Sequence, residues 1–515
     1  MLISSAAAAD DAVRASFAGR PVGDVIDGFR AEGYPFAYST TLVTPELVVQ
    51  AEPTPGDAVD IVVQILAPHG LTVRTEAGVH LVIPMPLESE DAIAEEVADA
   101  STEPPTIDNL IVSASRYAIS RDIGTSRFAL DQRSIHNMPD IGEDPIRVTH
   151  RLPGAAASGA SAIAHFRGGE KGEIGIMLNG QWLFDPFHIR DFQNVFSAVD
   201  ARAIDGVEVF TGGFPVRYGD RMSGMVLMDS LATDDSRHSE IGISVFNTSF
   251  LTTGTEGKSK WLFSARRGNL DLVIDPRFGE PSYFDVFGEF AYALSPRATI
   301  SLNGLYADDT VDLVLEAEPT ERDQISSDTR NAQFWLRLDN HWSEALSSTT
   351  VLSATNYANR RTGFANDREK MVASVVDHRE VRQIGFRQDW RWNASDSHLT
   401  QWGITVVSGD AEFNYAGDAE YFGLQALYEN QPPVVLRRVT ANPKGGSYAL
   451  YFSDRWKLSD QAILEWGLRW DDQTYTDVSS DAQLSPRINV LYHPTDKVEF
   501  RFSAGRYFQS GGTAH

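Results

Sequence analysis

The chain has 515 residues, no cysteine, and 71 acidic against 44 basic residues, which give a formal net charge of −27. This balance, without any Lys/Arg-rich run, argues against a nucleic-acid binder, because such a protein needs a basic surface to release counterions from phosphates. The absence of cysteine excludes a disulfide framework and cysteine metal sites, and the length predicts about two to four domains.

The N-terminus carries no complete targeting signal. Residues 1–10, MLISSAAAAD, resemble the small-residue end of a signal peptide but lack its basic and apolar regions. A signal-peptide remnant whose start is missing and a frayed terminus explain them equally well. No stretch approaches about 18 consecutive apolar residues, so we predict no transmembrane helix, while membrane β-strands stay open because their alternation gives a weak hydropathy signal.

Residues 13–85 are predicted to form a small α/β domain. Val22, Val25 and Ile26 recur at helical spacing, and Gly33 follows as a helix stop. A short strand is expected at 35–40.

A second helix of this domain is predicted in the sequence TPGDAVDIVVQIL. We expect Thr54 to cap this helix, Pro55 to occupy its first turn, and Asp57 to act as a first-turn acid. The sequence LTVRTEAGVHLVIP after it predicts a β-hairpin.

The composition changes twice after this domain. Residues 86–106 are acidic, poor in aromatics and rich in proline near their end, which is typical of a solvated linker. The β-prone run IDNLIVSAS begins at residue 107. Residues 115–235 form a glycine-rich α/β stretch, in which Asn179-Gly180 between two β-prone runs predicts a hairpin.

From about residue 236 the pattern is strict alternation. In ILEWGLRW (463–470) the Leu and Trp side chains share one face, while Glu465 and Arg469 share the other. About twelve such segments are predicted, near 239–251, 258–267, 284–294, 297–307, 330–341, 347–357, 380–392, 398–410, 446–457, 461–472, 486–493 and 497–507.

The connectors between these segments alternate between short turns and long polar stretches. The long ones are predicted at 268–283, 308–329, 358–379, 411–445 and 473–485. This alternation, with Trp390, Trp392 and Trp456 near segment ends, is typical of an outer-membrane barrel. A soluble sandwich or propeller is the alternative, but its strands average about five or six residues and its connectors do not alternate so regularly.

Three motifs together resemble the plug domain of TonB-dependent outer-membrane receptors. They are VEVFTGGFPVRYGDRMSGMVLM (207–228), FRGGEKGEIGIMLNGQWLFDPFH (166–188) and VTHRLPG (148–154). Residues 13–85 resemble the secretin/TonB short N-terminal domain of transducer-type members, and IDNLIVSAS lies where the family carries its TonB box.

The resemblance implies a mainly β fold: a transmembrane antiparallel β-barrel with an N-terminal α/β signalling domain and an α/β plug domain inside the barrel. The implied division is 1–10 signal-peptide remnant, 13–85 short N-terminal domain, 86–106 linker, 107–114 TonB box, 115–235 plug and 236–515 barrel. The family barrel has 22 strands and about 12 are predicted here, so we interpret the sequence as truncated within its barrel, since an open sheet edge in lipid leaves backbone groups unpaired.

The resemblance also implies a function without catalysis. The expected protein imports a ferric siderophore or another large scarce nutrient across the outer membrane of a Gram-negative bacterium, driven by TonB. Its N-terminal domain lies in the periplasm and signals to an anti-sigma regulator. We expect no enzyme activity, no cofactor, no metal site and no nucleic-acid partner; outer-membrane lipid surrounds the barrel. The alternatives are a carbohydrate or peptide transporter without signalling, and a soluble periplasmic β-rich binding or adhesive protein.

The TonB contact implied by the resemblance is a strand-addition site, whose alternative is the first plug strand. It comprises Ile107, Asp108, Asn109, Leu110, Ile111, Val112 and Ser113. Candidate ligand contacts are His165, Trp182, Phe184, Phe187 and His188. For any single one of these five, packing against the inner wall is the favoured alternative.

A third set of residues is expected to hold the plug. These residues are Arg167, Gly168, Gly169, Gly212, Gly213, Tyr218 and Gly219. Arg167 is expected to pair with wall acids or to act as a brace; removing one partner of a buried pair costs about 3–5 kcal/mol. We interpret the glycine cluster at 212–219 as the point where the chain turns out of the plug to become the first wall strand, with an ordinary hairpin turn as the alternative.

Overall fold

The protein is described here from a computed structural model. It describes residues 17–31, 34–38, 42–44, 47–54, 56–76, 79–84, 126–138, 144–190, 193–233, 235–273, 280–318, 321–367, 369–423, 427, 432–475, 482–495 and 498–510. The chain divides into two compact units, Met1–Glu103 and Pro104–His515, which are described separately. Within the described residues, none of the helices has the length and apolar character needed to cross a membrane.

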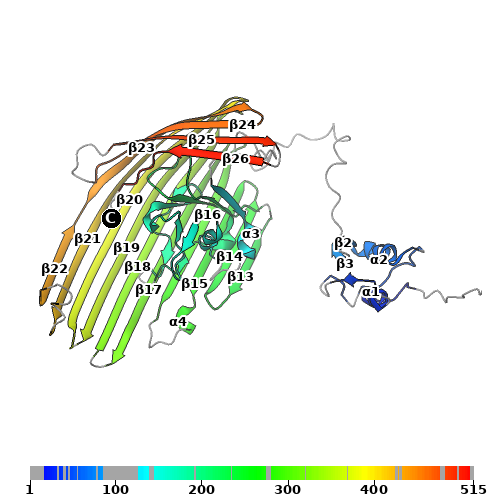
Figure 1. Ribbon diagram of the computed structural model, residues 1–515, viewed down its shortest axis with the longest axis horizontal. Helices are drawn as coiled ribbons and strands as arrows, with labels where there is room; N and C mark the ends of the chain where they lie inside the picture. Colours follow the sequence, from blue (N-terminus) through cyan, green and yellow to red (C-terminus); the bar gives the residue numbers. More distant parts are fainter. Residues whose placement is uncertain are drawn as a thin grey trace, which may run out of the picture. The chain divides into compact units, whose positions relative to one another are not determined.

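The first unit is a small α/β fold (Figure 1). Its elements are α1 (Val22–Ala31), β1 (Phe36–Ala37), α2 (Ala58–Leu66), η1 (Ala67–His69), β2 (Leu71–Glu76) and β3 (Val79–Pro84). The sheet order is β1-β3-β2, with β1 parallel and β2 antiparallel to β3. The apolar face of α1 that the sequence predicts is buried, because Val22, Val25 and Ile26 lie in one core with Val62 and Leu66 of α2.

The start of α2 differs from the prediction. The cap is Asp57, whose carboxylate accepts the Asp60 N–H at 2.8 Å. Thr54, the predicted cap, bonds instead to the Gln64 side chain, at 2.7 Å from hydroxyl to amide oxygen. Both residue types cap helices, and the one that stands directly before the first helical residue takes the position.

The second unit contains a plug domain and a wall. The plug elements are β4 (Arg127–Asp131), α3 (Gln132–Asn137), η4 (Arg147–Arg151), β5 (Ala155–Ala157), β6 (Ala164–Phe166), η5 (Lys171–Glu173), β7 (Ile174–Leu178), β8 (Gln181–Trp182), β9 (Phe187–His188), β10 (Phe196–Ser197), η6 (Ala201–Ala203), β11 (Ile204–Phe210) and β12 (Gly224–Ser230). Its main sheet has the order β4-β11-β12-β7-β8.

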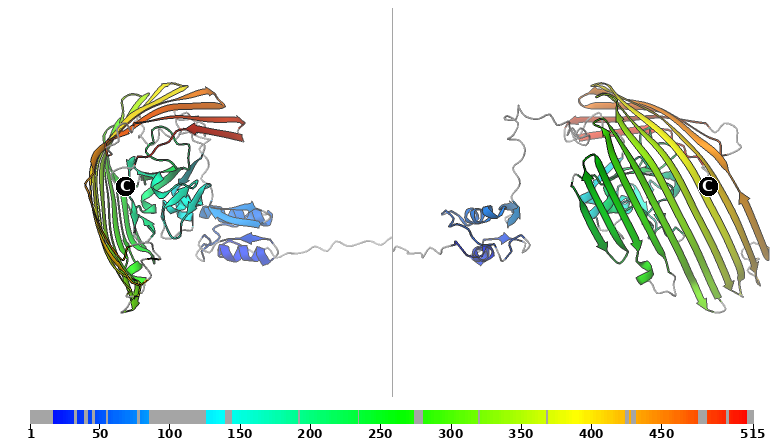
Figure 2. Two further views of the ribbon diagram at one scale, coloured as in Figure 1. Left: turned by 60° about the vertical axis from the view of Figure 1, so that its left-hand side comes forward. Right: turned by 180° about the vertical axis from the view of Figure 1, so that it is seen from behind.

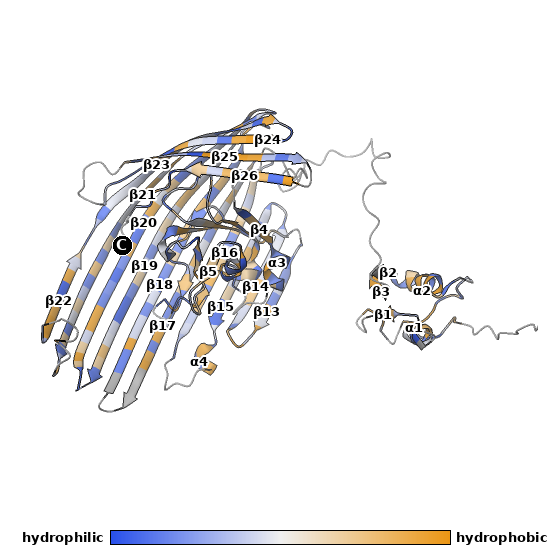
Figure 3. Ribbon diagram, in the orientation of Figure 1, coloured by the Kyte–Doolittle hydropathy of each residue, from blue (hydrophilic) through white to orange (hydrophobic). Residues whose placement is uncertain are grey.

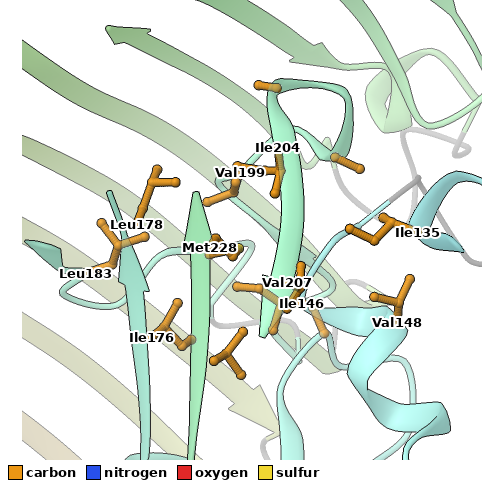
Figure 4. Packing of buried hydrophobic residues seen from close by; sticks show 14 of the residues in the cluster. Ile135, Ile146, Val148, Ile176, Leu178, Leu183, Val199, Ile204, Val207 and Met228 are labelled. Carbon is orange, nitrogen blue, oxygen red and sulfur yellow. The ribbon is translucent and has the colours of Figure 1, made fainter. Parts of the chain in front are cut away.

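Apolar side chains of the plug sheet form two clusters, a smaller one with Met177, Phe210 and Met225 and a larger one that is the plug core. Figure 4 shows Ile176 and Leu178 of β7, Met228 of β12 and Val207 of β11 in this core. The predicted Asn-Gly hairpin is confirmed, because Asn179 and Gly180 join the paired strands β7 and β8. Their φ angles of 48° and 80° lie in the left-handed region, which this residue pair favours.

The wall is a long antiparallel sheet that curves around the plug (Figure 2). Its strands are β13 (His238–Ile243), β14 (Asn247–Glu256), β15 (Ser259–Gly268), β16 (Ser282–Ser295), β17 (Ala298–Glu318), β18 (Glu321–His341), β19 (Leu346–Asp367), β20 (Met371–Ser395), β21 (His398–Tyr421), β22 (Val434–Ala441), β23 (Lys444–Ser459), β24 (Ala462–Gln473), β25 (Gln483–Thr495) and β26 (Val498–Gly505); the short helix α4 (Leu270–Val273) follows β15. The two ends of the sheet, β13 and β26, are not paired with each other among the described strands.

The fourteen wall strands exceed the predicted twelve for two reasons. The segment predicted at 239–251 turns back on itself at 244–246 and forms β13 and β14. β22 and β23 both pair with β21 and are separated only by Asn442 and Pro443, because proline has no N–H for the ladder.

Three predicted long connectors are largely strands instead. Residues 308–318 and 321–329 remain paired in β17 and β18, and residues 358–367 and 371–379 remain paired in β19 and β20. The connector predicted at 411–445 contains residues 411–421 of β21 and the whole of β22. Polar residues dominate these extensions, and their buried apolar positions, such as Val311 and Leu313, are too few to predict strands. At about 3.3 Å per residue the 25 residues of β20 reach about 80 Å, whereas a membrane barrel's apolar band is about 25 Å tall.

Alternation along the wall strands separates two faces, as Figure 3 shows by the alternating colours. Exposed apolar side chains on one face include Phe263, Phe290, Leu302, Phe334, Leu352, Ile384, Leu450, Trp466 and Phe502. Buried polar side chains on the plug-facing side include Ser264, Arg266, Asp285, Asn303, Gln333, Thr355, Gln401, Ser453, Glu465 and Asn489. The predicted two-faced barrel strands are thereby confirmed.

Where the wall meets the plug core, its inner side chains are apolar. Leu251, Leu262 and Phe287 are buried in the plug core cluster, and Trp335 stacks on Phe287 with 6.2 Å between ring centroids. Plug and wall therefore share one core, and polar wall residues surround this apolar contact.

Candidate functional site: the plug–wall interface and its cavity

A cavity of about 580 Å³ lies between the plug and the wall. The plug contributes Trp182, Phe184 and Arg190 to its lining, and the wall contributes Tyr357 and Arg379, among others. Aromatic faces and guanidinium groups in one cavity suit a large ligand that carries rings or negative charge.

The plug side of this cavity is tied to the wall. The Phe184 and Tyr357 rings lie 5.2 Å apart, and the Arg190 guanidinium lies 5.6 Å above the Tyr357 ring and donates to its hydroxyl. Arg190 also forms an ion pair with Asp185, at 2.7 Å. The Phe184 carbonyl accepts from Asn331 at 2.7 Å and from Gln333 at 3.0 Å.

A fully buried ion pair network lies next to the cavity. The His188 ring of β9 donates to Asp309 of β17 at 2.5 Å and to Asp285 of β16 at 2.9 Å. Arg266 of β15 binds the same Asp285 at 3.0 Å, and Tyr283 stacks on His188 with 4.3 Å between ring centroids. Two cations thus neutralise two wall carboxylates in a site that water does not reach.

This network changes the titration of His188. Burial by itself lowers the pKa of the imidazole, but the carboxylates of Asp309 and Asp285 outweigh burial and raise the pKa to about 9. His188 is therefore charged at neutral pH and holds the plug against the two neighbouring wall strands β16 and β17.

On β24 and β25, two wall arginines hold the plug loop that joins β11 to β12. The Arg487 guanidinium donates to the Phe214, Pro215 and Tyr218 carbonyls at 3.1, 2.8 and 2.7 Å. Arg469 donates to the Val216 and Arg217 carbonyls at 3.4 and 3.3 Å. The loop is therefore bound through its backbone.

The glycine-rich loop is not the exit from the plug, which corrects the junction interpretation. β11 and β12 are antiparallel neighbours in the plug sheet, and the wall begins only at β13. The glycines serve the approach to the wall: a Cβ at Gly219 would lie 1.9 Å from Arg469 Nε. Gly212 and Gly213 have φ 133° and 65°, a region that other residues rarely adopt.

The predicted holding residue Arg167 has a different partner. Its guanidinium donates to the hydroxyl of Ser126, a plug residue, and no described wall acid forms an ion pair with it. Within the described part of the chain its geometry fits the brace alternative. Gly168 has φ 79°, a Cβ at Gly169 would lie 2.4 Å from Ser223 Cβ, and Tyr218 is buried next to Phe210.

The structure separates the predicted ligand contacts into two groups. Trp182, Phe184 and Phe187 line the cavity, although Phe187 is buried in the plug core. His188 is fully buried in the ion pair network, and His165 bonds to the Gly169 carbonyl within the plug at 2.9 Å. Residues 107–113 lie outside the described residues.

Sequence reasoning missed the wall residues of this interface. Asp285, Asp309, Arg266, Arg469 and Arg487 all occupy inward positions of alternating strands. Charge on the polar side of such strands was visible in the sequence, but its plug partners were not. Among the described residues, no group of three or more His, Asp or Glu side chains is placed to hold a metal ion.

A curved, two-faced antiparallel sheet with a folded domain bound to its polar side defines a plugged β-barrel protein of the outer-membrane type. Residues 244–514 match the family described as "TonB dependent receptor-like, beta-barrel". The match covers more than half of the chain, and the chain belongs to the TonB-dependent receptors.

Solved structures of related fold share little sequence with this chain. The ferric citrate transporter FecA in its unliganded form is 16% identical with a TM-score of 0.51, over 75% of this chain and 63% of that chain. The ferric yersiniabactin uptake receptor FyuA from Yersinia pestis is 10% identical with a TM-score of 0.51, over 74% of this chain and 72% of that chain. FpvA of P. aeruginosa bound to a heterologous pyoverdine is 13% identical with a TM-score of 0.51, over 93% of this chain and 68% of that chain.

These likenesses show the fold alone. The chain spans 63% of the length of the FecA chain. No curated protein matches the sequence.

The Arg487 contacts predict a specific loss of stability. Arg487→Gln leaves three carbonyls without their donor, and each buried unpaired group costs about 1–3 kcal/mol. We expect the free energy of plug unfolding to fall by about 3 kcal/mol, measured in detergent by urea titration of tryptophan fluorescence. The control Arg330→Gln, at an outward arginine whose side chain is 74% exposed, should change it by less than about 0.5 kcal/mol.

The raised pKa of His188 predicts a pH dependence of plug stability. Because this pKa rises from 6.5 to about 9 on folding, the stabilisation is complete below pH 6.5 and is lost as the pH rises to about 9. The contribution is on the order of 3 kcal/mol. In the same urea titration the wild type should weaken between these pH values and His188→Gln should not; a wild-type curve as flat as that of the variant would contradict the assignment.

Proposed function

We propose that the chain is the receptor portion of an energy-coupled importer of the outer membrane, and that its ligand is a ferric siderophore. The observation that carries this proposal is the cavity over the plug, lined by aromatic rings and arginines. A plugged barrel blocks free diffusion, so a ligand bound there passes only when the plug moves. TonB is the partner expected to move it, through residues 107–113.

The fold relatives support the choice of ligand class. The names of the relatives with similar fold mention ferric citrate, ferric yersiniabactin and pyoverdine. The cavity chemistry agrees with a charged, ring-bearing ligand, since Arg379 and Arg190 line it together with Tyr357 and Phe413. A ferric siderophore brings its own iron ligands, so the wall needs none.

The first unit is proposed to signal. Its position before the plug and its resemblance to the secretin/TonB short N-terminal domain support contact with a periplasmic anti-sigma regulator. The first alternative is uptake of a carbohydrate or peptide without signalling, since aromatic faces also stack on sugars. The second, a soluble periplasmic β-rich protein, is disfavoured by the family match over residues 244–514.

The test of uptake and signalling uses a strain that lacks the gene, complemented with the whole protein. Deletion of 107–113 should abolish uptake of siderophore-bound radiolabelled iron. Deletion of 13–85 should leave uptake intact and abolish ligand-induced transcription. Accumulation of labelled oligosaccharide but not of iron would favour the first alternative, and loss of uptake on deleting 13–85 would contradict the division of roles.

A pair of arginines on β20 tests the charge of the ligand. Arg379 faces the cavity with 38% of its side chain exposed, whereas Arg382 faces outward with 58% exposed. Arg379→Gln should raise the half-saturating concentration for uptake about tenfold, because a charged hydrogen bond contributes about 1.5–3 kcal/mol. Arg382→Gln should leave it unchanged; equal effects of both variants would argue against an anionic ligand in this cavity.

A further inference from the structure

One segment of the plug contains several non-glycine residues with positive φ. Asp185, Ile189, Gln193 and Asn194 have φ of 38°, 55°, 66° and 51°, and they are four of the seven non-glycine residues with positive φ among the described residues. We call residues 185–190 and 193–197 the anchor hairpin. A β-branched residue such as Ile189 is a clear outlier in this region, and such strain persists only where the surroundings enforce it.

Wall contacts centred on His188 hold the outgoing side of this hairpin, while plug residues bind Gln193 and Asn194 on its return side. Asp309, which accepts from the His188 ring, also accepts the Ile189 N–H at 3.3 Å, so one carboxylate holds the charge and the strained residue after it. On the return side of the hairpin, Arg266 donates to the Ser197 carbonyl at 2.7 Å. The strained backbone is thereby fastened to β15, β16 and β17.

The same hairpin borders the cavity. Asp185, Pro186, Phe187 and Arg190 line it, on both sides of the buried His188 in sequence. A ligand that displaces any of these residues acts directly on the strained segment.

We propose that the anchor hairpin is a strained two-state element which the His188 contacts to Asp285 and Asp309 hold against the wall, and that its release frees this side of the plug. His188 is thus a positioning residue for plug movement. We call the contacts of His188 with Asp285 and Asp309 the latch. The link to ligand movement rests on the proposed function, whereas the backbone strain and the latch do not.

The titratable groups around His188 belong to this balance. Arg266, Asp285, Tyr283 and Asp309 face it from β15, β16 and β17. Within the plug, the Asp144 carboxylate accepts the Ser197 N–H, and Asp200, paired with Arg202, interacts with Arg266. With His188 charged, the two wall carboxylates are matched by two cations. Neutral His188 leaves one wall carboxylate uncompensated in a buried site, which favours release.

The latch is tested by hydrogen exchange of the whole protein in detergent, without ligand. His188→Gln should lower the protection factors of the anchor hairpin by about tenfold or more, in line with the loss of a buried charge pair. His165→Gln is the matched control, because this plug histidine bonds to the Gly169 carbonyl at 2.9 Å and forms no ion pair among the described residues. Unchanged protection in His188→Gln, or an equal loss in His165→Gln, overturns the proposal.

The strain is tested separately at Gln193, whose side chain is exposed and accepts the Ala160 N–H at 3.0 Å. Gln193→Gly and Gln193→Ala both lose this bond, but only glycine relieves the positive φ. The hairpin should exchange more slowly in Gln193→Gly than in Gln193→Ala, and equal rates overturn the proposal even if His188→Gln does not fold. Because neither measurement involves transport, failure here leaves the uptake test of the proposed function unaffected.

Discussion

Inward polarity of the wall strands is the constraint on which the structure depends. A domain inside a barrel presents loops with many free carbonyls and N–H groups, and each one left unpaired in a dry interface costs about 1–3 kcal/mol. The wall supplies the missing partners: Asn331 and Gln333 bind the Phe184 carbonyl, and Arg487 binds three carbonyls of the 212–219 loop. The outer face of the same strands needs no polar group, because it faces an apolar surrounding.

Much of the fold was predictable because these two faces alternate with period two. The Asn179-Gly180 hairpin was predictable as well, since it depends on two residues and their backbone preference. The strand extensions at 308–329 and 358–379 were not, because they are mostly polar, with few apolar positions such as Val311 and Leu313, and polar sequence fits loop and strand equally well. The role of the glycine loop also escaped prediction, because its reason is Arg469, some 250 residues further along the chain.

The candidate site was predictable in part. Trp182 and Phe184 line the cavity, and their contact with a ligand stays a prediction. His188 was expected at the ligand and instead forms a buried ion pair, since its partners Asp285 and Asp309 come from two strands that only the barrel register brings together. A sequence shows which residues are chemically able to bind, but non-local pairing decides what they meet.

The chemistry of the anchors explains how a plug is held firmly and yet stays removable. A buried ion pair adds little net stability, because desolvation offsets its attraction, but removing one partner leaves a bare charge that costs several kcal/mol. Partial opening of such a contact is costly, because it leaves one buried charge without its partner. Complete release costs far less free energy, because water then solvates both partners. The His188 network is of this kind and lies where the plug meets the wall, whereas Arg487 holds the plug through neutral carbonyl groups. An apolar interface of the same area would oppose complete release of the plug more strongly.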